Sequence, residues 1–147
     1  MKKQRLWVIV VVLFLAMVVI GGCGKDDEAA PIYSVTVSGT LIYAGWTTGD
    51  YVVAIYPDGV AASETGYIGF ADVTGVASPP YTVPVTTAAT NAYAFAWNET
   101  TGEGNPDIPG VEFFGCSAVF AVGAANVTGV DITLELNATS CNSHFTP

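Results

Sequence analysis

Basic residues are scarce in this sequence: four Lys and Arg residues stand against 13 Asp and Glu residues. The four are Lys2, Lys3, Arg5 and Lys25, so no Lys or Arg follows residue 25. Nucleic-acid binding needs cationic groups that neutralise phosphates, and this composition excludes it. Electrostatic attraction to anionic lipids is excluded for the same reason. The charged partners that remain are calcium and basic patches on other proteins.

Histidine is rarer still, because His144 near the C-terminus is the only one. A nucleophilic site needs a base that a third group holds in place, and a chain end is a poor scaffold for that. The acidic pair Glu103 and Asp107 has a spacing too common to indicate a paired-carboxylate site. We therefore expect His144 to be an idle surface side chain and the protein not to be an enzyme.

Long apolar runs are also few, and the one at residues 6–20 follows a basic start. It has 15 residues, whereas a spanning helix needs about 20. A basic start, a short apolar run and small residues after it are the parts of a secretory signal. The sequence therefore predicts an export signal that forms a hydrophobic helix.

The run ends in Ile20, Gly21, Gly22 and Cys23, which resemble the lipobox of bacterial lipoproteins. The resemblance implies that residues 1–22 are removed and that Cys23 receives fatty acyl chains such as palmitate. Two or more acyl chains give stable membrane anchoring. Gly24 is not the aspartate that retains enterobacterial lipoproteins at the inner membrane, so the resemblance implies the outer membrane. An ordinary cleaved signal and an uncleaved anchor helix remain the alternatives.

Processing at Cys23 would leave one domain on a short tether. Residues 23–31 are polar and lack apolar periodicity, so they are expected to form a flexible tether. Residues 32–147 suffice for one domain with a single core. One lysine against 13 acidic residues gives this product a net charge near −12, so its lipid must provide the attachment to the membrane.

Two cysteines remain beside Cys23, and they form an even pair. In an exported protein, Cys116 and Cys141 are candidates for a disulfide. The bond would close a loop of roughly 25 residues and stabilise the fold by about 3 kcal/mol. The alternative is a buried free Cys116 with a loose Cys141. A metal site is disfavoured, because only His144 lies nearby.

The rest of the chain alternates short apolar segments with turn signals and has no convincing helical periodicity. Period-2 alternation predicts sheets with one buried and one solvated face. The fold class expected is all-β, a single seven-stranded two-sheet antiparallel sandwich, prealbumin-like or immunoglobulin-like. The expected strands cover residues 32–43, 51–56, 67–73, 81–85, 92–97, 112–122 and 130–136.

Individual residues sharpen this prediction. Gly39 is expected to mark a bulge or a close backbone approach, and Pro84 an edge strand. The tail from residue 137 looks irregular, and a disulfide would hold it against the domain. The clearest alternation predicts four inward side chains, Val130, Ile132, Leu134 and Leu136.

Five stretches in this order resemble the prealbumin-like sandwich of carboxypeptidase regulatory-like domains in bacterial surface proteins. The resemblance implies a non-catalytic module that binds or spaces, with a protein or a glycan as its partner at the cell envelope. The stretches are residues 37–41, 51–56, 81–85, 92–97 and 127–134.

Some relatives in that family carry an acidic, glycine-rich loop suited to a cation after the aromatic strand. Calcium takes six to eight oxygen ligands from carboxylates, amides and carbonyls. The corresponding loop here lacks the spacing of an EF-hand, and a solvated acidic connection is the alternative. Calcium is thus a possible cofactor; the candidate ligands are Asn98, Glu99, Glu103, Asp107 and Glu112.

Aromatic side chains offer a second candidate site, a platform on which sugar rings stack. The residues considered are Tyr43, Trp46, Tyr56, Tyr67 and Trp97. Trp97 alternates with alanines in a strand, so its burial is expected. Trp46 lies in a turn and is the preferred carbohydrate-binding residue.

Overall fold

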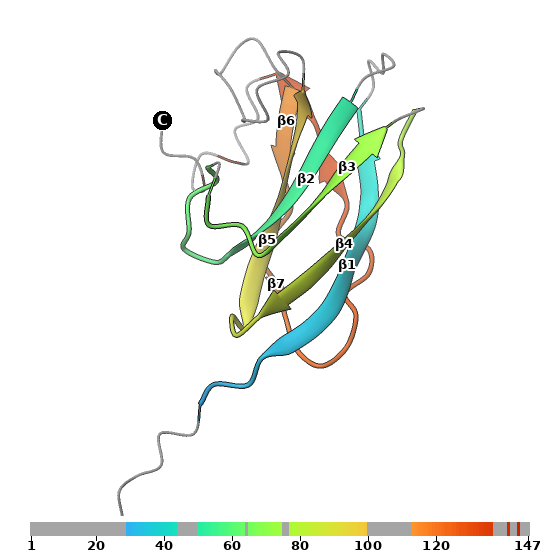
Figure 1. Ribbon diagram of the computed structural model, residues 1–147. Helices are drawn as coiled ribbons and strands as arrows, with labels where there is room; N and C mark the ends of the chain where they lie inside the picture. The colour runs from blue at the N-terminus through green and yellow to red at the C-terminus, as the bar shows by residue number, and fades with distance from the viewer. Residues whose placement is uncertain are drawn as a thin grey trace, which may run out of the picture. The chain divides into compact units, whose positions relative to one another are not determined.

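The computed structural model describes residues 29–43, 50–63, 65–74, 77–99, 113–136, 141 and 144. The chain divides into two compact units, residues 1–30 and 31–147, and all nine strands belong to the second unit (Figure 1). The expected signal helix lies outside the described residues. Within the described ranges, no helix is long and apolar enough to cross a membrane.

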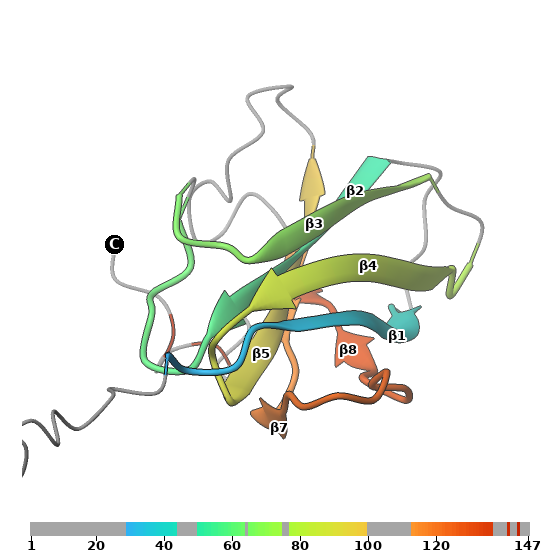
Figure 2. The same ribbon diagram turned by 60° about the horizontal axis from the view of Figure 1, so that its bottom comes forward.

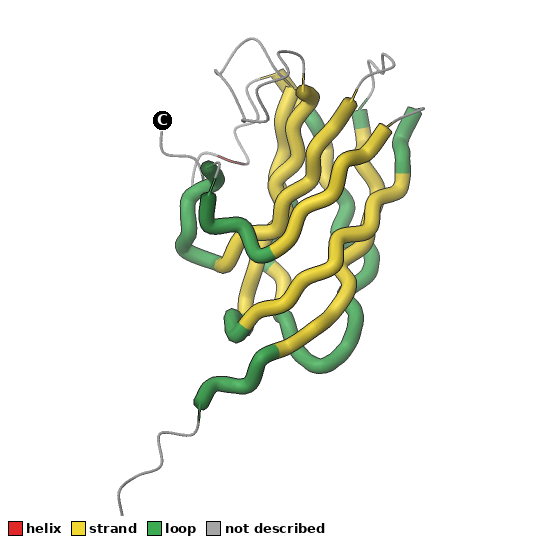
Figure 3. The backbone as a smooth tube through the Cα atoms, in the orientation of Figure 1, coloured by secondary structure: helices red, strands yellow, loops and turns green. Residues whose placement is uncertain are grey.

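The described residues form nine strands where seven were expected, because the last two expected strands are each divided. The segment 112–122 forms β6 and β7, and the segment 130–136 forms β8 and β9. Figure 3 distinguishes the strands from the loops between them by colour. The strands are β1 (Tyr33–Ile42), β2 (Asp50–Pro57), β3 (Gly69–Thr74), β4 (Pro80–Thr87), β5 (Asn91–Glu99), β6 (Phe113–Cys116), β7 (Phe120–Ala121), β8 (Ile132–Thr133) and β9 (Glu135–Leu136).

The strands form two sheets, as expected for a sandwich. One sheet has the order β4-β1-β8, and the other has the order β3-β2-β5-β6-β9 with β7 beside β5 (Figure 2). All strand pairs are antiparallel except β1 with β8. The expectation of a wholly antiparallel sandwich was wrong at this pair. Residues 43–131 connect β1 to β8, and a connection of this length permits parallel pairing.

The division between β8 and β9 marks a change of sheet. Ile132 and Thr133 pair with β1, whereas Glu135 and Leu136 pair with β6. The backbones approach closely at this corner, and a methyl group on Gly115 would overlap the Thr133 carbonyl oxygen. Leu136 is therefore 47% exposed, and the prediction that it faces inward was wrong.

The other expected details of the smaller sheet are confirmed. Val130, Ile132 and Leu134 are buried. A methyl group on Gly39 would overlap the Val130 carbonyl oxygen, so the close approach expected at this glycine is present. Pro84 lies on β4, which stands at the end of the order β4-β1-β8 and is an edge strand among the described strands.

An apolar core fills the space between the two sheets. It contains β-branched and aliphatic side chains from both sheets, together with three alanines of β5 and two tyrosines. Its buried residues are Val35, Val37, Leu41, Tyr51, Val53, Ile55, Val73, Tyr81, Val83, Val85, Ala92, Ala94, Ala96, Val122, Val130, Ile132 and Leu134. We call this set the inner cluster.

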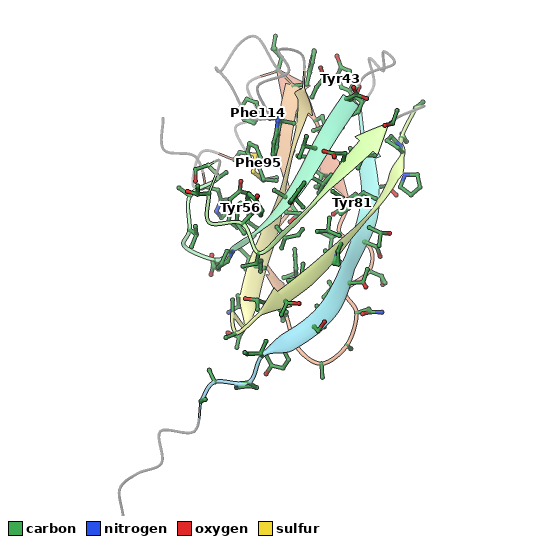
Figure 4. The ribbon with its side chains drawn as sticks, viewed as in Figure 1. Tyr43, Tyr56, Tyr81, Phe95 and Phe114 are labelled. Carbon is green, nitrogen blue, oxygen red and sulfur yellow. A yellow bond between two sulfur atoms is a disulfide. The ribbon has the colours of Figure 1, made fainter. Side chains whose placement is uncertain are left out.

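A second apolar cluster lies on the opposite face of the larger sheet. Its aromatic members come from β2, β5 and β6, and Phe95 and Phe114 lie near each other there (Figure 4). The expectation of one solvated face was therefore wrong for β5, which is buried on both faces. The outer cluster comprises Ala54, Tyr56, Ala62, Tyr93, Phe95, Trp97, Phe114 and Cys141.

Candidate functional site

A pocket of about 180 Å³ opens on the outer face of the larger sheet, beside the outer cluster. It takes side chains from three adjacent strands, β3, β2 and β5, and from the connection between β2 and β3. Its lining consists of Val52, Ala54, Tyr56, Ser63, Tyr67, Phe70, Asp72 and Trp97.

Strand register explains why the pocket is hollow. Val52 on the middle strand pairs with Asp72 on one side and Trp97 on the other. Ala54 is flanked in the same way by Phe70 and by an aromatic residue of β5. Directly paired residues lie on the same face of a sheet, about 5 Å apart. Small side chains on β2 between large side chains on its neighbours leave a trough along β2.

The connection between β2 and β3 forms one side of the trough. Pro57, Asp58 and Gly59 make the turn expected from the sequence, in which Gly59 has φ = 80° and the Val60 amide donates to the Pro57 carbonyl at 3.1 Å. A positive φ favours glycine there, because other residues meet a steric cost. The turn sends the chain back over the outer face of the sheet.

Two buried tyrosines hold this connection in place. The Tyr56 hydroxyl donates to the Ser63 carbonyl at 2.5 Å, and the Tyr93 hydroxyl donates to the Val60 carbonyl at 2.6 Å. Burial raises the pKa of both hydroxyls, so they stay protonated and donate at neutral pH. The rim of the pocket is thereby fixed to its base.

The exposed rings at the rim are Tyr67 and Phe70, which are 42% and 52% exposed. Their centroids lie 5.2 Å apart with an interplanar angle of 72°. Tyr67 also meets Tyr56 edge-on, with centroids 6.4 Å apart at 89°. The rim is therefore an angled aromatic corner supported from below by a buried ring.

Two polar groups of the lining stand out, the Trp97 indole nitrogen and the Asp72 carboxylate. Trp97 is only 4% exposed, and its Nε1 is buried with no hydrogen-bond partner in the described part of the chain. Asp72 is exposed, and no Lys or Arg follows residue 25. Buried indole N–H groups usually find an acceptor, so the unpaired Trp97 donor is unusual. Because this nitrogen is fully buried, the exposed polar group that the pocket offers is the Asp72 carboxylate.

A second hollow of about 320 Å³ lies between residues 117–120 and 127–131. Its only aromatic lining residue is Phe120. The Asp131 carboxylate beside it already accepts a hydrogen bond from the Thr40 amide at 2.9 Å. Because this carboxylate is used within the sandwich, the aromatic pocket is the better candidate for a ligand site.

The structure brings together part of the aromatic platform considered from the sequence. Tyr56, Tyr67 and Trp97 line one pocket, whereas Tyr43 packs against Phe113 with centroids 4.4 Å apart. Trp46, the preferred carbohydrate residue, lies outside the described residues.

Sequence reasoning missed Phe70 and Asp72 in the pocket lining. The available signal was their period-2 spacing on β3, which puts both on the face of Val52 and Ala54.

The acidic loop proposed for calcium is described only at its start. The Asn98 side-chain amide donates to the Asp50 carbonyl at 3.2 Å. The side chain of Glu99, and Glu103, Asp107 and Glu112 entirely, lie outside the described residues. Among the described residues, no three His, Cys, Asp or Glu side chains form a group that could hold a metal. Calcium binding stays a prediction, which melting with calcium and then with a chelator would check.

The predicted disulfide is present: Cys116 and Cys141 are bonded, with their Cα atoms 5.4 Å apart. Cys141 is fully buried in the outer cluster. Just beyond it, the His144 ring is half-buried and stacks on Tyr93 with centroids 4.0 Å apart. The expectation of an idle surface histidine was wrong, since His144 packs over the aromatic face and its carbonyl accepts from the Ala62 amide at 2.8 Å.

The proposed lipidation site, Cys23, and the signal before it lie outside the described residues, as does most of the tether. The resemblances to lipoproteins and to prealbumin-like domains stay predictions. A scan against protein-family models and searches of curated proteins and of solved structures each found no match to this chain.

Proposed function

We propose that this chain is a lipid-anchored protein of the bacterial cell envelope whose β-sandwich is a non-catalytic binding module. The observation that carries the binding role is the aromatic pocket, which combines the exposed rings of Tyr67 and Phe70 with the exposed carboxylate of Asp72. Concave, mostly apolar sites with a few polar groups are typical ligand sites.

The composition of the pocket favours binding over catalysis. Its ionisable groups are one exposed carboxylate, Asp72, and the phenols of Tyr56 and Tyr67. A general base works best with a pKa near the operating pH, and burial moves the pKa of Tyr56 upward, away from neutrality. The Tyr56 hydroxyl is therefore suited to hydrogen bonding and not to proton transfer.

The N-terminal sequence supports the anchor. Removal of residues 1–22 would leave Cys23 as the lipid-bearing end and residues 23–31 as the tether. Because the remaining product is strongly acidic, its attachment would depend on the acyl chains of Cys23. Gly24 favours delivery to the outer membrane.

Fractionation of bacterial cells that express the full chain tests this proposal. The wild-type chain should float with outer-membrane vesicles in a density gradient, and mass spectrometry should find acyl chains on an N-terminal Cys23. The Cys23→Ala variant should leave the outer-membrane fraction. Wild-type protein without acyl groups, or a Cys23→Ala variant that still floats with the outer membrane, would contradict the anchor.

A further inference from the structure

We infer that the aromatic pocket takes up one basic side chain, a lysine or an arginine, from a partner protein. This inference rests on the proposed binding role and names the chemistry of the partner. Four features carry it: the size of the pocket, the exposed rings of its rim, the exposed polar groups of its lining, and the charge of the chain around it.

The size of the pocket limits its occupant to a single side chain. Its volume of about 180 Å³ is below the range of about 300–1,000 Å³ that is usual for drug-sized ligands. The rim is open to solvent, since the rings of Tyr67 and Phe70 are exposed. A partner can therefore insert one side chain from the solvent side of the outer face while the rest of its surface stays outside.

The rim attracts cations through a ring and a carboxylate together. The face of an aromatic ring is negative, and it stabilises a protonated nitrogen within about 6 Å of the ring centroid. Phe70 and Asp72 line the same pocket and are two residues apart on β3, so they lie on one face about 7 Å apart. A cation between them reaches both groups, whereas an apolar side chain would gain nothing from the carboxylate.

The exposed polar groups of the lining complement a donor. An ionised carboxylate such as that of Asp72 accepts hydrogen bonds and donates none. The exposed Ser63 hydroxyl donates its proton to the Thr65 carbonyl at 2.6 Å, so it offers a ligand only its lone pairs. The Trp97 nitrogen is buried and takes no part. The head groups of lysine and arginine carry donors and no acceptor, which matches this set.

The charge of the chain favours a basic partner. No Lys or Arg follows residue 25, so Asp72 has no basic neighbour within residues 26–147. Removal of residues 1–22 would leave a net charge near −12. A field of one sign attracts surfaces of the opposite sign and speeds their encounter. The Asp72 carboxylate would then give a basic side chain of that surface its local partner.

A small organic cation is the main competitor for the pocket. A quaternary ammonium such as choline has the charge but no N–H donor, so it would leave the acceptors of Ser63 and Asp72 without hydrogen bonds. A basic side chain brings donors and an apolar stem, and such stems pack along apolar surface like that of Val52 and Ala54. Aromatic residues are enriched at protein interfaces, and the partner around that side chain would cover the exposed rings of the rim.

Nuclear magnetic resonance of the full chain in uncharged detergent micelles tests the inference. The probes are short glycine peptides with both ends blocked and one central lysine, arginine or norleucine, which has the stem of lysine without its ammonium. A basic peptide should shift the amide signals of Phe70 and Asp72 saturably and bind at least about three-fold more tightly than the norleucine peptide. No saturable shift by either basic peptide at about 50 mM, or equal affinity of the norleucine peptide, would overturn the inference.

Two small cations test whether the ligand is a protein side chain. Choline is the quaternary ammonium, and butylamine reproduces the head group and stem of lysine without a peptide. Both should bind no more tightly than the lysine peptide. Tighter binding of either one would identify a free organic cation as the ligand and overturn the proposal of a partner protein.

Matched variants then locate the contacts. Phe70→Ala should weaken binding of the lysine peptide about five-fold, whereas Ile42→Ala, a strand position of similar exposure, should leave it unchanged. Asp72→Asn should weaken it about three-fold through loss of an exposed ion pair. The control is Glu135→Gln, an equal change of net charge in the same row of paired residues, four strands and about 19 Å away. An equal loss in these two variants would show attraction to the whole chain and overturn the assignment to the pocket.

The variants also protect the test against misfolding. Phe70 and Asp72 are exposed, so their replacement should leave the melting temperature within a few degrees of wild type. If Phe70→Ala melts normally and binds the lysine peptide as tightly as wild type, the pocket is not the site. Because anchoring is measured at Cys23, failure of peptide binding would leave the envelope proposal intact, and a failed anchor would leave the peptide result intact.

Discussion

The two faces of β5 differ in what packs against them. The inner face presents Ala92, Ala94 and Ala96 to the β-branched side chains of the smaller sheet. The outer face presents Tyr93, Phe95 and Trp97. Tyr93 contacts Val60 of the β2–β3 connection and His144, and Phe95 stacks on Phe114 of β6. Small side chains let the two sheets approach, whereas the large rings need irregular segments to cover them.

This difference indicates a division of roles. The inner cluster fills the space between the two sheets mainly by apolar contact, with a buried hydrogen bond from the Tyr81 hydroxyl to the Val130 carbonyl. The outer cluster depends on specific links, namely two tyrosine hydroxyls, one disulfide and the stacked His144 ring. We expect the inner cluster to set the global stability and the outer cluster to keep the pocket in shape.

Ile55→Ala should produce the largest effect, because Ile55 is fully buried in the inner cluster on β2. Removing its side chain leaves a cavity between the sheets and should lower the free energy of unfolding by about 4 kcal/mol. Denaturant unfolding followed by fluorescence and by circular dichroism measures it. The control is Val52→Ala, a half-buried position on the opposite face of β2, which should lower the free energy of unfolding by about 1 kcal/mol. Equal losses of unfolding free energy in the two variants would contradict the difference between the two faces.

Loss of the disulfide should come next. With Cys116→Ala and Cys141→Ala combined, the unfolded chain regains the freedom of a 25-residue loop, and the free energy of unfolding should fall by about 3 kcal/mol. Hydrogen exchange should increase first at the Ala62 amide, whose acceptor is the His144 carbonyl in the tail. Amides of β1 paired with β4 should keep their protection; uniform loss of protection would show that the two clusters unfold as one.

The sequence predicted the individual strands better than the points at which the chain passes from one sheet to the other. The alternation of apolar and polar residues predicted the bounds of β1 to β5 to within a few residues. In each of these strands the alternate side chains keep to the same face of the sheet along the strand's length. The alternation failed at residues 132–136, where the chain changes partner sheet between Thr133 and Glu135. Nothing local distinguishes Leu134, which is buried, from Leu136, which is exposed, since the difference is set by the strands they pair with.

The pocket was predictable only in part for the same reason. Aromatic content and alternation singled out Tyr56, Tyr67 and Trp97. Phe70 and Asp72 join them through the register of β3 on β2, which a single sequence does not specify. The disulfide could be predicted because only two cysteines remained once Cys23 was assigned to lipid.

Alkaline titration should compare the two clusters through one tyrosine in each. Burial raises the pKa of Tyr81, in the inner cluster, and of Tyr93, in the outer cluster, above the ordinary value of 10.0. Above pH 10 the unfolded chain loses these protons while the folded chain keeps them. The stability is therefore complete below pH 10 and falls as the pH rises, by about 1.4 kcal/mol per unit for each tyrosine.

Chemical unfolding at pH 9, 10 and 11 measures how the free energy of unfolding changes with pH. Single substitutions then show how much of this change each tyrosine contributes. Tyr81→Phe and Tyr93→Phe should each remove about one tyrosine's share of the slope. An unchanged slope in both variants would contradict the assignment to these two residues.

Tyr93→Phe at neutral pH should have a small effect that acts mainly on the outer face. It removes the hydrogen bond to the Val60 carbonyl but keeps the ring that stacks on His144, so the cost should be about 1 kcal/mol. Tyr67→Phe, at the exposed rim, should change the stability by less than about 0.5 kcal/mol. Exchange at the Val60 and Ala62 amides should rise in Tyr93→Phe and stay at the wild-type rate in Tyr67→Phe. A rise in hydrogen exchange at the β1 amides in Tyr93→Phe would contradict this prediction. It would show that the β2–β3 connection and the two sheets unfold together.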